Sequence, residues 1–410
     1  MLVNAMPGNT AFDSFDCRDS VRDCMSLEGT AEWAHVGLCK LSMTDAPALQ
    51  QVDRTCVLLG SRKLSYFSGC DYFRLSSHPD VLRALREGTN RFGLNVAASR
   101  LTTGNHKLYL DLEKRLAEFF QTERAVLLSS GYAANIAVAQ ALSGTFSHVL
   151  LDERAHASLV DASEIFSCPI VRFRHRDPKQ LADILQVIGK TAKPIILTDG
   201  MFAHDGSVAP VGAYLGLLPK DGVIVVDDAH AAGVLGANGR GTLEYLEISE
   251  QSRIIRTMTL SKAFGVYGGA ILGSSTLQKR VLEKSRFYVG NTPMPLPLAA
   301  AALQALHILK TDRQLAARLS ENVRYVKEEL RQIRYPVEPT PSPIIPLLPE
   351  TQREIGRLKR LFLAQRVFPP WIKYPGGPPL GYFRLALSSE HTKKQLDDFL
   401  RIGRGWWLER

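Results

Sequence analysis

The chain has 410 residues, 45% of them hydrophobic and 22% charged, and its formal net charge is +9. This composition is typical of a globular protein large enough for two domains. The lysines and arginines are spread along the chain rather than gathered in runs, which favours a solvated surface over nucleic-acid binding. No stretch approaches the ~18 apolar residues of a membrane helix, and no apolar signal segment begins the chain. We therefore expect no membrane insertion and a cytoplasmic protein.

Residues 1–42 are polar and weakly patterned, and we expect a loosely structured N-terminal extension there, followed by an N-terminal segment at 43–95. His78-Pro79-Asp80 predicts the start of a helix, because proline is favoured in the first helical turn. A second helix is predicted at 108–120, where apolar residues recur at helical spacing. Short apolar runs then alternate with helical segments. We expect strands at 125–128, 149–151, 171–173, 195–198, 223–226, 254–260 and 269–272.

Continuous apolar runs between helices are typical of a buried, mostly parallel sheet flanked by helices, so the predicted class is α/β. After about residue 297 the pattern changes to helices, proline-rich segments and an alternating strand at 382–387. We therefore expect a large domain at 96–297 and a smaller C-terminal α+β domain at 298–410. The six cysteines form no Cys-x-x-Cys pair, so we expect free thiols and no metal site.

Lys262 lies in a glycine-bounded turn that runs from Thr259 to Gly265. A lysine forms an imine with an aldehyde only when it is unprotonated, and the small neighbours Ser261 and Ala263 leave room for a ring. Taken alone, such a lysine is more often a surface residue. However, an aliphatic strand about thirty residues earlier ends in Asp227, at the edge where open α/β sheets bind ligands. The pair predicts a Schiff-base site for pyridoxal phosphate.

Asp227 and His230 suit the ring of that cofactor. A carboxylate can keep a pyridine nitrogen protonated, which makes the ring an electron sink, and a histidine can hydrogen-bond the phenolic oxygen. The alternative is that Asp227 merely caps the following turn. Ser130-Gly131-Tyr132 joins a strand to a helix, where backbone N–H groups bind phosphate well. His156, after another strand, can stack on the ring, although a lone histidine there is more often structural.

In this order, the segments resemble those of the fold-type-I pyridoxal-phosphate enzymes and, within them, the α-oxoamine synthases, such as 8-amino-7-oxononanoate synthase and glycine C-acetyltransferase. The resemblance runs from about residue 60 to the end. It rests on the segments 103–106, 112–113, 130–135, 152–159, 227–236, 259–269 and 383–387. It implies a large cofactor-binding domain and a decarboxylative condensation of an amino acid with an acyl-CoA, carried out by a homodimer with shared active sites.

The resemblance also assigns roles to single residues. Lys262 and His156 would be catalytic, Lys262 by moving protons at the α-carbon of the substrate. The cofactor would be bound by Ser130, Gly131, Tyr132, His156, Asp227, His230, Thr259, Lys262 and, from the neighbouring subunit, Thr292. Arg384 would bind the amino acid's carboxylate through a bidentate pair, and Cys70 would lie on the substrate side. The mildly positive chain also suits an anionic substrate such as an acyl-CoA.

Three departures from the family pattern fall on the substrate side. Cys70 stands where the family has an asparagine that helps to bind the carboxylate, and Ala203 where it has a serine near the ring oxygen. Residues 96–98, Val-Ala-Ala, replace a glycine-rich stretch, and their Cβ atoms narrow a close approach of backbone to substrate. The departures leave two other interpretations open: an aminotransferase on the same scaffold, and a cofactor-binding protein that has lost catalysis.

Overall fold

The computed structural model describes residues 47–373 and 377–409, and the elements below all lie in the unit Ala48–Arg410. The expected extension at 1–42 lies outside the described residues. Among the described helices, none is long and apolar enough to cross a membrane.

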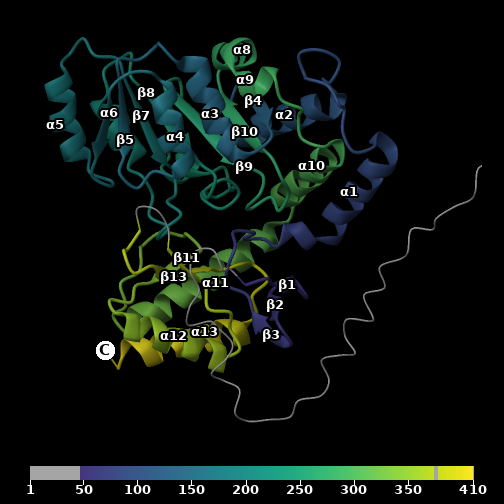
Figure 1. Ribbon diagram of the computed structural model, residues 1–410, viewed down its shortest axis with the longest axis vertical. Helices are drawn as coiled ribbons and strands as arrows, with labels where there is room; N and C mark the ends of the chain where they lie inside the picture. The colour runs from purple at the N-terminus through teal and green to yellow at the C-terminus, as the bar shows by residue number, and fades with distance from the viewer. Residues whose placement is uncertain (1–46, 374–376, 410) are drawn as a thin grey trace, which may run out of the picture. The chain divides into compact units, whose positions relative to one another are not determined.

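A seven-stranded sheet lies among helices in the larger part of the described fold (Figure 1). Its strand order is β4 (Arg124–Leu128), β10 (Gly269–Gly273), β9 (Ile254–Thr259), β8 (Val223–Asp227), β7 (Pro194–Asp199), β5 (His148–Asp152) and β6 (Ile170–Phe173). Strand β10 runs antiparallel to both of its neighbours, whereas the pairs from β9 to β6 are parallel. The predicted α/β class and mostly parallel sheet are therefore confirmed.

Both faces of the sheet are buried, which explains why its strands read as continuous apolar runs. Successive residues of β7 face opposite sides: Ile195 packs in one apolar cluster and Ile196 in another. The first cluster includes residues of α3 (Gly131–Leu142), α4 (Ala157–Ile165), α8 (Ser275–Lys284) and α9 (Arg286–Val289). The second includes residues of α5 (Pro178–Ile188), α6 (Val211–Leu217) and α7 (Thr242–Tyr245).

Three further helices pack together beside the β4–β10 end of the sheet. They are α1 (Pro79–Phe92), α2 (Lys107–Phe120) and α10 (Leu296–Thr311), and α10 contacts both of the others. Helix α1 begins as predicted, with Pro79 in its first turn and the His78 side chain accepting a hydrogen bond from the Asp80 N–H. A short 3-10 helix, η3 (Leu75–Ser77), precedes it.

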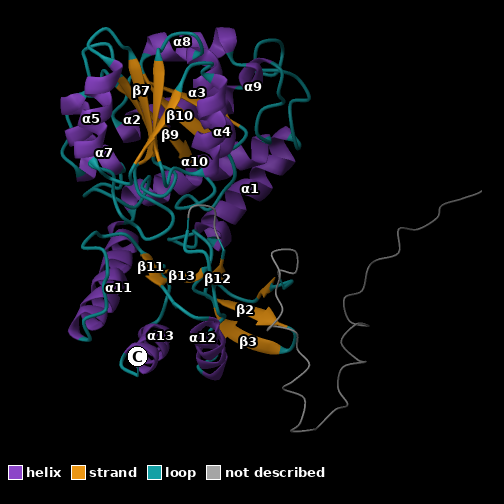
Figure 2. Cartoon of the chain, turned by 60° about the vertical axis from the view of Figure 1, so that its left-hand side comes forward, coloured by secondary structure: helices purple, strands orange, loops and turns teal. Residues whose placement is uncertain are grey.

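The C-terminal part is the expected smaller α+β region (Figure 2). Its antiparallel sheet has the order β11 (Ile344–Leu347), β13 (Tyr382–Ala386) and β12 (Trp371–Ile372). Its helices are α11 (Arg313–Gln332), α12 (Gln352–Ala364) and α13 (Lys393–Trp407). The boundaries 43–95, 96–297 and 298–410 stay a prediction.

The N-terminal segment contains a small antiparallel sheet that the sequence pattern did not indicate. It consists of β1 (Gln50–Gln51), β2 (Cys56–Leu59) and β3 (Arg62–Ser65). Ser65 of β3 exchanges backbone hydrogen bonds with Arg366 and Phe368, just beyond α12, at 2.8 and 2.9 Å. Strands of two to four residues are too short to show a periodic pattern. The pairing of Ser65 with residues beyond α12 is also too distant in sequence to be marked locally.

Candidate active site

The carboxyl ends of neighbouring parallel strands bring the predicted cofactor residues to one edge of the sheet. Asp227 ends β8, Asp199 ends β7 directly beside it in register, and Thr259 ends β9. This edge is where open α/β sheets bind ligands. The chain's alternation of strand and helix therefore gathers residues that are far apart in sequence.

Asp227 is buried and held by fixed donors. Its Oδ2 accepts a hydrogen bond from Asn135 Nδ2 at 2.6 Å, and its Oδ1 accepts one from the Ala229 N–H at 2.9 Å. Asn135 is held in turn, because it also donates to Ser158 Oγ and accepts from Thr257 Oγ1. The carboxylate is therefore fixed in direction, as a partner for a ring nitrogen must be.

His230 is buried three residues further on. Its Nδ1 lies 2.8 Å from the hydroxyl of Tyr72, a residue that comes from the N-terminal segment. Burial, reinforced by the positive charge of Lys262, holds the pKa of His230 well below its usual value. The ring is therefore neutral and fixed by Tyr72.

Lys262 lies in a tight turn that closes the β9–β10 connection. The Leu260 N–H donates to the Gly268 carbonyl, and the Gly265 N–H donates to the Lys262 carbonyl, both at 2.9 Å. Gly265 has a φ of +64°, and a Cβ there would lie 2.2 Å from the Ser76 nitrogen, so only glycine is accommodated. Burial lowers the pKa of Lys262. Its amine has no hydrogen-bond partner in the described part of the chain, which suits a lysine that must react while unprotonated.

The turn from Ser130 into α3 has the properties of a phosphate site. Ser130 caps the helix by accepting from the Ala133 N–H at 3.1 Å. The N–H groups of Gly131 and Tyr132 donate to no described residue, and they lie at a helix N-terminus, which favours anions. A Cβ at position 131 would lie 2.8 Å from the Cβ of Thr259, so glycine permits this close packing. The residues present thus fit the phosphate, the ring and the aldehyde of pyridoxal phosphate.

His156 caps the N-terminus of α4 beside the same edge. Its backbone N–H donates to Asp199 Oδ2 at 2.8 Å, and its ring lies 6.3 Å from that of Tyr132 in an edge-to-face arrangement. The Tyr132 hydroxyl donates to Asp161, which raises the pKa of Tyr132 to about 12. The ring contact with His156 and the hydrogen bond to Asp161 therefore orient the Tyr132 side chain, while its backbone N–H remains available to a phosphate oxygen.

Arg384, in β13, reaches the site from the C-terminal part. Its Nε donates to the Ala203 carbonyl, and its Nη2 lies 3.6 Å from the Sγ of Cys70. Burial disfavours its charge, but the neighbouring Cys70, Tyr72 and Tyr382 raise the pKa of Arg384, so the guanidinium stays charged. Cys70 and Ala203 therefore both contact Arg384. These are two of the three positions at which the sequence departs from the family pattern.

Ala97, within the third departure, adopts a left-handed backbone with a φ of 48°. That conformation costs an alanine about 1 kcal/mol relative to glycine. The replaced glycine-rich stretch therefore keeps a glycine-like backbone at this position.

Thr292 is exposed, and no hydrogen bond joins it to the gathered residues within the described chain. Its neighbour Asn291 does approach the phosphate turn, where Nδ2 donates to Ser129 Oγ at 3.1 Å. Tyr72, Asn135 and Asp199 were not predicted as site residues. Asp199 could have been found, because it ends an apolar strand just as Asp227 does; the contacts of Tyr72 and Asn135 depend on the folded arrangement.

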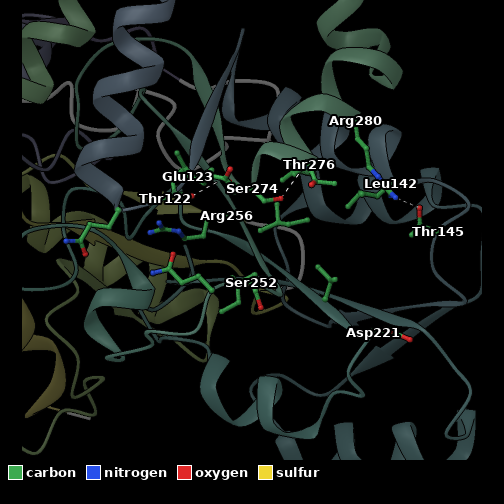
Figure 3. Close-up of a pocket in the computed structure, with 18 of the residues that line it drawn as sticks. Thr122, Glu123, Leu142, Thr145, Asp221, Ser252, Arg256, Ser274, Thr276 and Arg280 are labelled. Atoms are coloured by element: carbon green, nitrogen blue, oxygen red, sulfur yellow. Dashed lines mark hydrogen bonds between the residues drawn. The ribbon is translucent and has the colours of Figure 1, made fainter.

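A cavity of about 520 Å³ lies at the opposite edge of the sheet (Figure 3). Its lining includes Thr122, Ser252 and Ser274, close to the amino ends of β4 and β9 and the carboxyl end of the reversed β10. Arg280 bridges one side of it by donating to Thr145 Oγ1 at 3.3 Å. None of the predicted cofactor or substrate residues lines this cavity.

Comparisons with known proteins agree with this arrangement. The family model described as aminotransferase class I and II matches residues 67–402. An 8-amino-7-oxononanoate synthase of Thioalkalivibrio sulfidiphilus is 36% identical over 345 residues, which are 84% of this chain and 88% of that protein. A lysine-to-alanine variant of serine palmitoyltransferase from S. paucimobilis, with a bound PLP–myriocin aldimine, superposes with a TM-score of 0.82 at 25% identity, covering 88% of this chain and 92% of that one. An 8-amino-7-oxononanoate synthase from Francisella tularensis gives a TM-score of 0.73 at 26% identity, covering 84% and 98%.

The fold is that of a fold-type-I pyridoxal-phosphate-dependent transferase. The chain belongs to the aminotransferase class I and II family and, within it, to the α-oxoamine synthases.

Proposed function

We propose that this enzyme condenses an amino acid with an acyl-CoA, releasing CoA and carbon dioxide, as an 8-amino-7-oxononanoate synthase-like acyltransferase of the cytoplasm. The observation that carries the proposal is the convergence of Lys262, Asp227 and His230 with Arg384, which approaches from the C-terminal part. The similarity to 8-amino-7-oxononanoate synthases over most of the chain supports the choice of an acyl-CoA as the second substrate.

Asp227, His230 and His156 would hold the ring of the cofactor. Asp227, fixed by Asn135, would pair with the ring nitrogen and keep it protonated, while neutral His230 would hydrogen-bond the ring oxygen. His156, positioned by its bond to Asp199, would stack on the ring. When bound, pyridoxal phosphate supplies an electron-withdrawing ring that disperses negative charge from the α-carbon of the amino acid.

The phosphate would lie at the start of α3. The N–H groups of Gly131 and Tyr132 would donate to its oxygens, with Ser130 and Thr259 beside them. These residues would hold one end of the cofactor and Asp227 the other, which would restrict its orientation relative to Lys262.

Lys262 and Arg384 would act on the amino acid. Because burial favours the neutral amine, Lys262 can take the proton from the α-carbon and later return it. Arg384 binds the carboxylate with two parallel N–H bonds, which orients the bond to be broken relative to the ring. Cys70, beside that arginine, is the residue most directly placed to alter carboxylate binding.

We further propose that the enzyme is a homodimer in which Thr292 of one chain reaches the cofactor phosphate of the other. Exposed apolar residues near this loop support a covered surface: Leu94 is 69% exposed, Leu101 48% and Phe287 41%. Ser99 Oγ donates to the Val289 carbonyl at 2.7 Å and so joins two of the segments that carry these residues. Sedimentation velocity should give a mass of two chains; a single chain at micromolar concentration contradicts the dimer.

The activity is tested by supplying the purified enzyme with pyridoxal phosphate, each L-amino acid in turn and an acyl-CoA, and measuring free thiol. The expected result is release of CoA that requires both substrates and is lost in Lys262→Ala. If 2-oxo acids convert amino acids without any need for CoA, the enzyme is an aminotransferase and the proposal is wrong. A screen of amino acids for shifts in the visible spectrum would identify the amino-acid substrate.

A further inference from the structure

A second cleft, of about 720 Å³, lies between α11 and the loop that follows His230. Its walls are formed by α11, by residues 234–247 and by the segment Pro339–Pro341. None of the residues assigned above to cofactor or amino-acid binding lines it. The cleft is therefore separate from the carboxyl-edge site. It does adjoin the loop after His230, which begins at that site.

One face of α11 presents a row of cations to this cleft: Arg313, Arg324, Lys327 and Arg331. Their spacings of eleven, three and four residues place all four on one side of a helix with 3.6 residues per turn. Small residues fill the gap between the first two cations, where Ala317 and Ser320 line the cleft. Arg324, Lys327 and Arg331 therefore form a cluster, and the wall between it and Arg313 leaves room for a ligand.

Two of these cations lack partners. Within the described ranges, the side chains of Arg324 and Arg331 form no hydrogen bond or ion pair, and both are exposed. Arg313 donates to Asn238 Oδ1 at 3.3 Å, which links the row to the opposite wall. Unpaired arginines on the wall of a cleft, with their planar N–H forks free, are suited to phosphoryl groups.

Lys327 is the buried member of the row, with only 2% of its surface exposed. Its Nζ donates to the carbonyls of Glu338 and Thr340, at 3.1 and 2.6 Å. An ammonium group has three N–H donors, so one remains beyond these two bonds. A buried ammonium group that has no carboxylate partner is stabilised when an anion binds next to it.

The acidic residues of the cleft do not neutralise this row. Glu244 is already engaged by the backbone N–H groups of Asn238 and Arg240, at 3.1 and 2.9 Å. Glu247 is exposed and lines the same cleft, where it forms no ion pair with a described residue. The remaining wall is apolar and includes Phe73, Val234 and Tyr245.

We propose that this cleft binds a small anion with two or more phosphoryl groups, held by Arg324, Lys327 and Arg331. Its volume is that of a metabolite site rather than of a macromolecular surface. Arg324 and Arg331 lie about 10 Å apart along the helix, with Lys327 between them, so linked phosphoryl groups can contact more than one cation. The proposal goes beyond the acyltransferase activity and does not depend on it.

Binding should be coupled to proton uptake by Lys327. Burial and the charge of Arg331 lower the pKa of Lys327 to about 8, against the opposing effects of Glu338 and Asp205. Those two carboxylates are paired with Arg176 and Arg154, at 3.4 and 3.3 Å. Arg324 adds a further positive charge from the same helix face. An anion beside the amine raises its pKa, so at pH 8 the complex takes up protons on forming.

The experiment is isothermal titration calorimetry of the full-length protein, saturated with pyridoxal phosphate, using inorganic pyrophosphate as the probe. We expect saturable binding at one site per chain. Arg324→Gln and Arg331→Gln should each weaken it by about tenfold, as for the loss of one charge-assisted contact. Titrations at pH 8 in two buffers of different ionisation enthalpy should show more proton uptake, or less release, for the native chain than for Lys327→Arg, because the arginine does not titrate and pyrophosphate contributes equally to both.

Two further variants make the test specific. Lys114→Gln with Arg115→Gln removes two positive charges from α2, one more than either single variant, on the wall of a different groove, and should leave binding unchanged. Glu247→Gln removes a repulsive charge and should tighten binding, a gain that misfolding cannot produce. Absence of saturable binding, an equal loss in the α2 control, or weaker binding in Glu247→Gln would each overturn the proposal.

Discussion

Arg384 Nη2 lies 3.6 Å from the sulfur of Cys70, so the arginine expected to bind the substrate carboxylate already has a neighbour that can carry negative charge. Burial alone would raise the pKa of Cys70, but the positive charge of Arg384 is the largest opposing effect and the net shift lowers that pKa. A lowered pKa favours the thiolate, and a thiolate at this position would neutralise Arg384. Cys70 would then compete with the carboxylate that the family's asparagine would assist.

The first prediction concerns the reactivity of this thiol. Cys56 and Cys168 are also part-buried, but burial raises the pKa of each. Because the thiolate is the reactive form, iodoacetamide at pH 7 should alkylate Cys70 before Cys56 and Cys168, the other two cysteines of the described residues, as measured by peptide mass spectrometry. A bound amino acid should slow this labelling. Equal or faster labelling of Cys56 or Cys168 would contradict the lowered pKa.

The second prediction concerns substrate binding. Cys70→Asn replaces a competing anion with an amide donor, so the KM for the amino acid should fall by about tenfold, the effect of one charge-assisted hydrogen bond. Cys70→Ser removes the anion without restoring the amide and should have an intermediate effect. A KM that is unchanged or higher in Cys70→Asn would mean that the substrate carboxylate binds elsewhere.

The third prediction concerns the support of Asp227. Asn135→Ala removes the donor that lies 2.6 Å from Asp227 Oδ2, so the protein should lose about 1–3 kcal/mol of stability and retain less pyridoxal phosphate per chain. Asn322→Ala is the matched control, since that amide donates to the Ser388 carbonyl at 2.9 Å, away from the site. The control should lose stability but keep its cofactor. Full cofactor retention in Asn135→Ala would refute the role given to this contact.

The fourth prediction concerns acid stability. His391 is buried against Phe67, accepts a hydrogen bond from the Ser388 N–H and lies 3.1 Å from the Tyr66 carbonyl through its other nitrogen. Burial lowers its pKa from 6.5 to about 3. The unfolded chain therefore binds the extra proton between these values, and stability falls as pH falls below about 6.5. From this group alone, the free energy of unfolding should be about 2 kcal/mol lower at pH 5 than at pH 7.5.

His391→Gln provides the comparison, because glutamine keeps an acceptor and a donor but does not titrate. Urea unfolding at the two pH values should show a smaller pH-dependent loss in this variant than in the native chain. If both proteins lose the same stability, another group is responsible.

The central sheet and the cofactor residues could be predicted because each is marked locally. Residues 223–226 are all apolar because both faces of their strand are buried. Asp227 follows them at the carboxyl end of the strand, where sheets of this type bind ligands. The order of Gly131, His156, Asp227 and Lys262 along the chain then predicted that these residues form one cofactor site at one edge of the sheet.

The contacts that complete the site could not be predicted in the same way. Tyr72 reaches His230 across 158 positions, and Arg384 reaches Cys70 across 314. Such pairs are set by how the N-terminal segment and β13 pack, which no local pattern encodes. The strands β1 to β3 were missed for a different reason: they have two, four and four residues, which is too short to show a periodic pattern.

The most direct test of the cofactor site compares Lys262→Ala with the native chain, each purified with pyridoxal phosphate and freed of excess. The native protein should show the visible absorption band of lysine-bound pyridoxal phosphate, and reduction with borohydride should fix the cofactor to the peptide that contains Lys262. Lys262→Ala should show neither, while a Lys114→Ala control should show both. An unchanged band in Lys262→Ala, or a label on another lysine, would contradict the account.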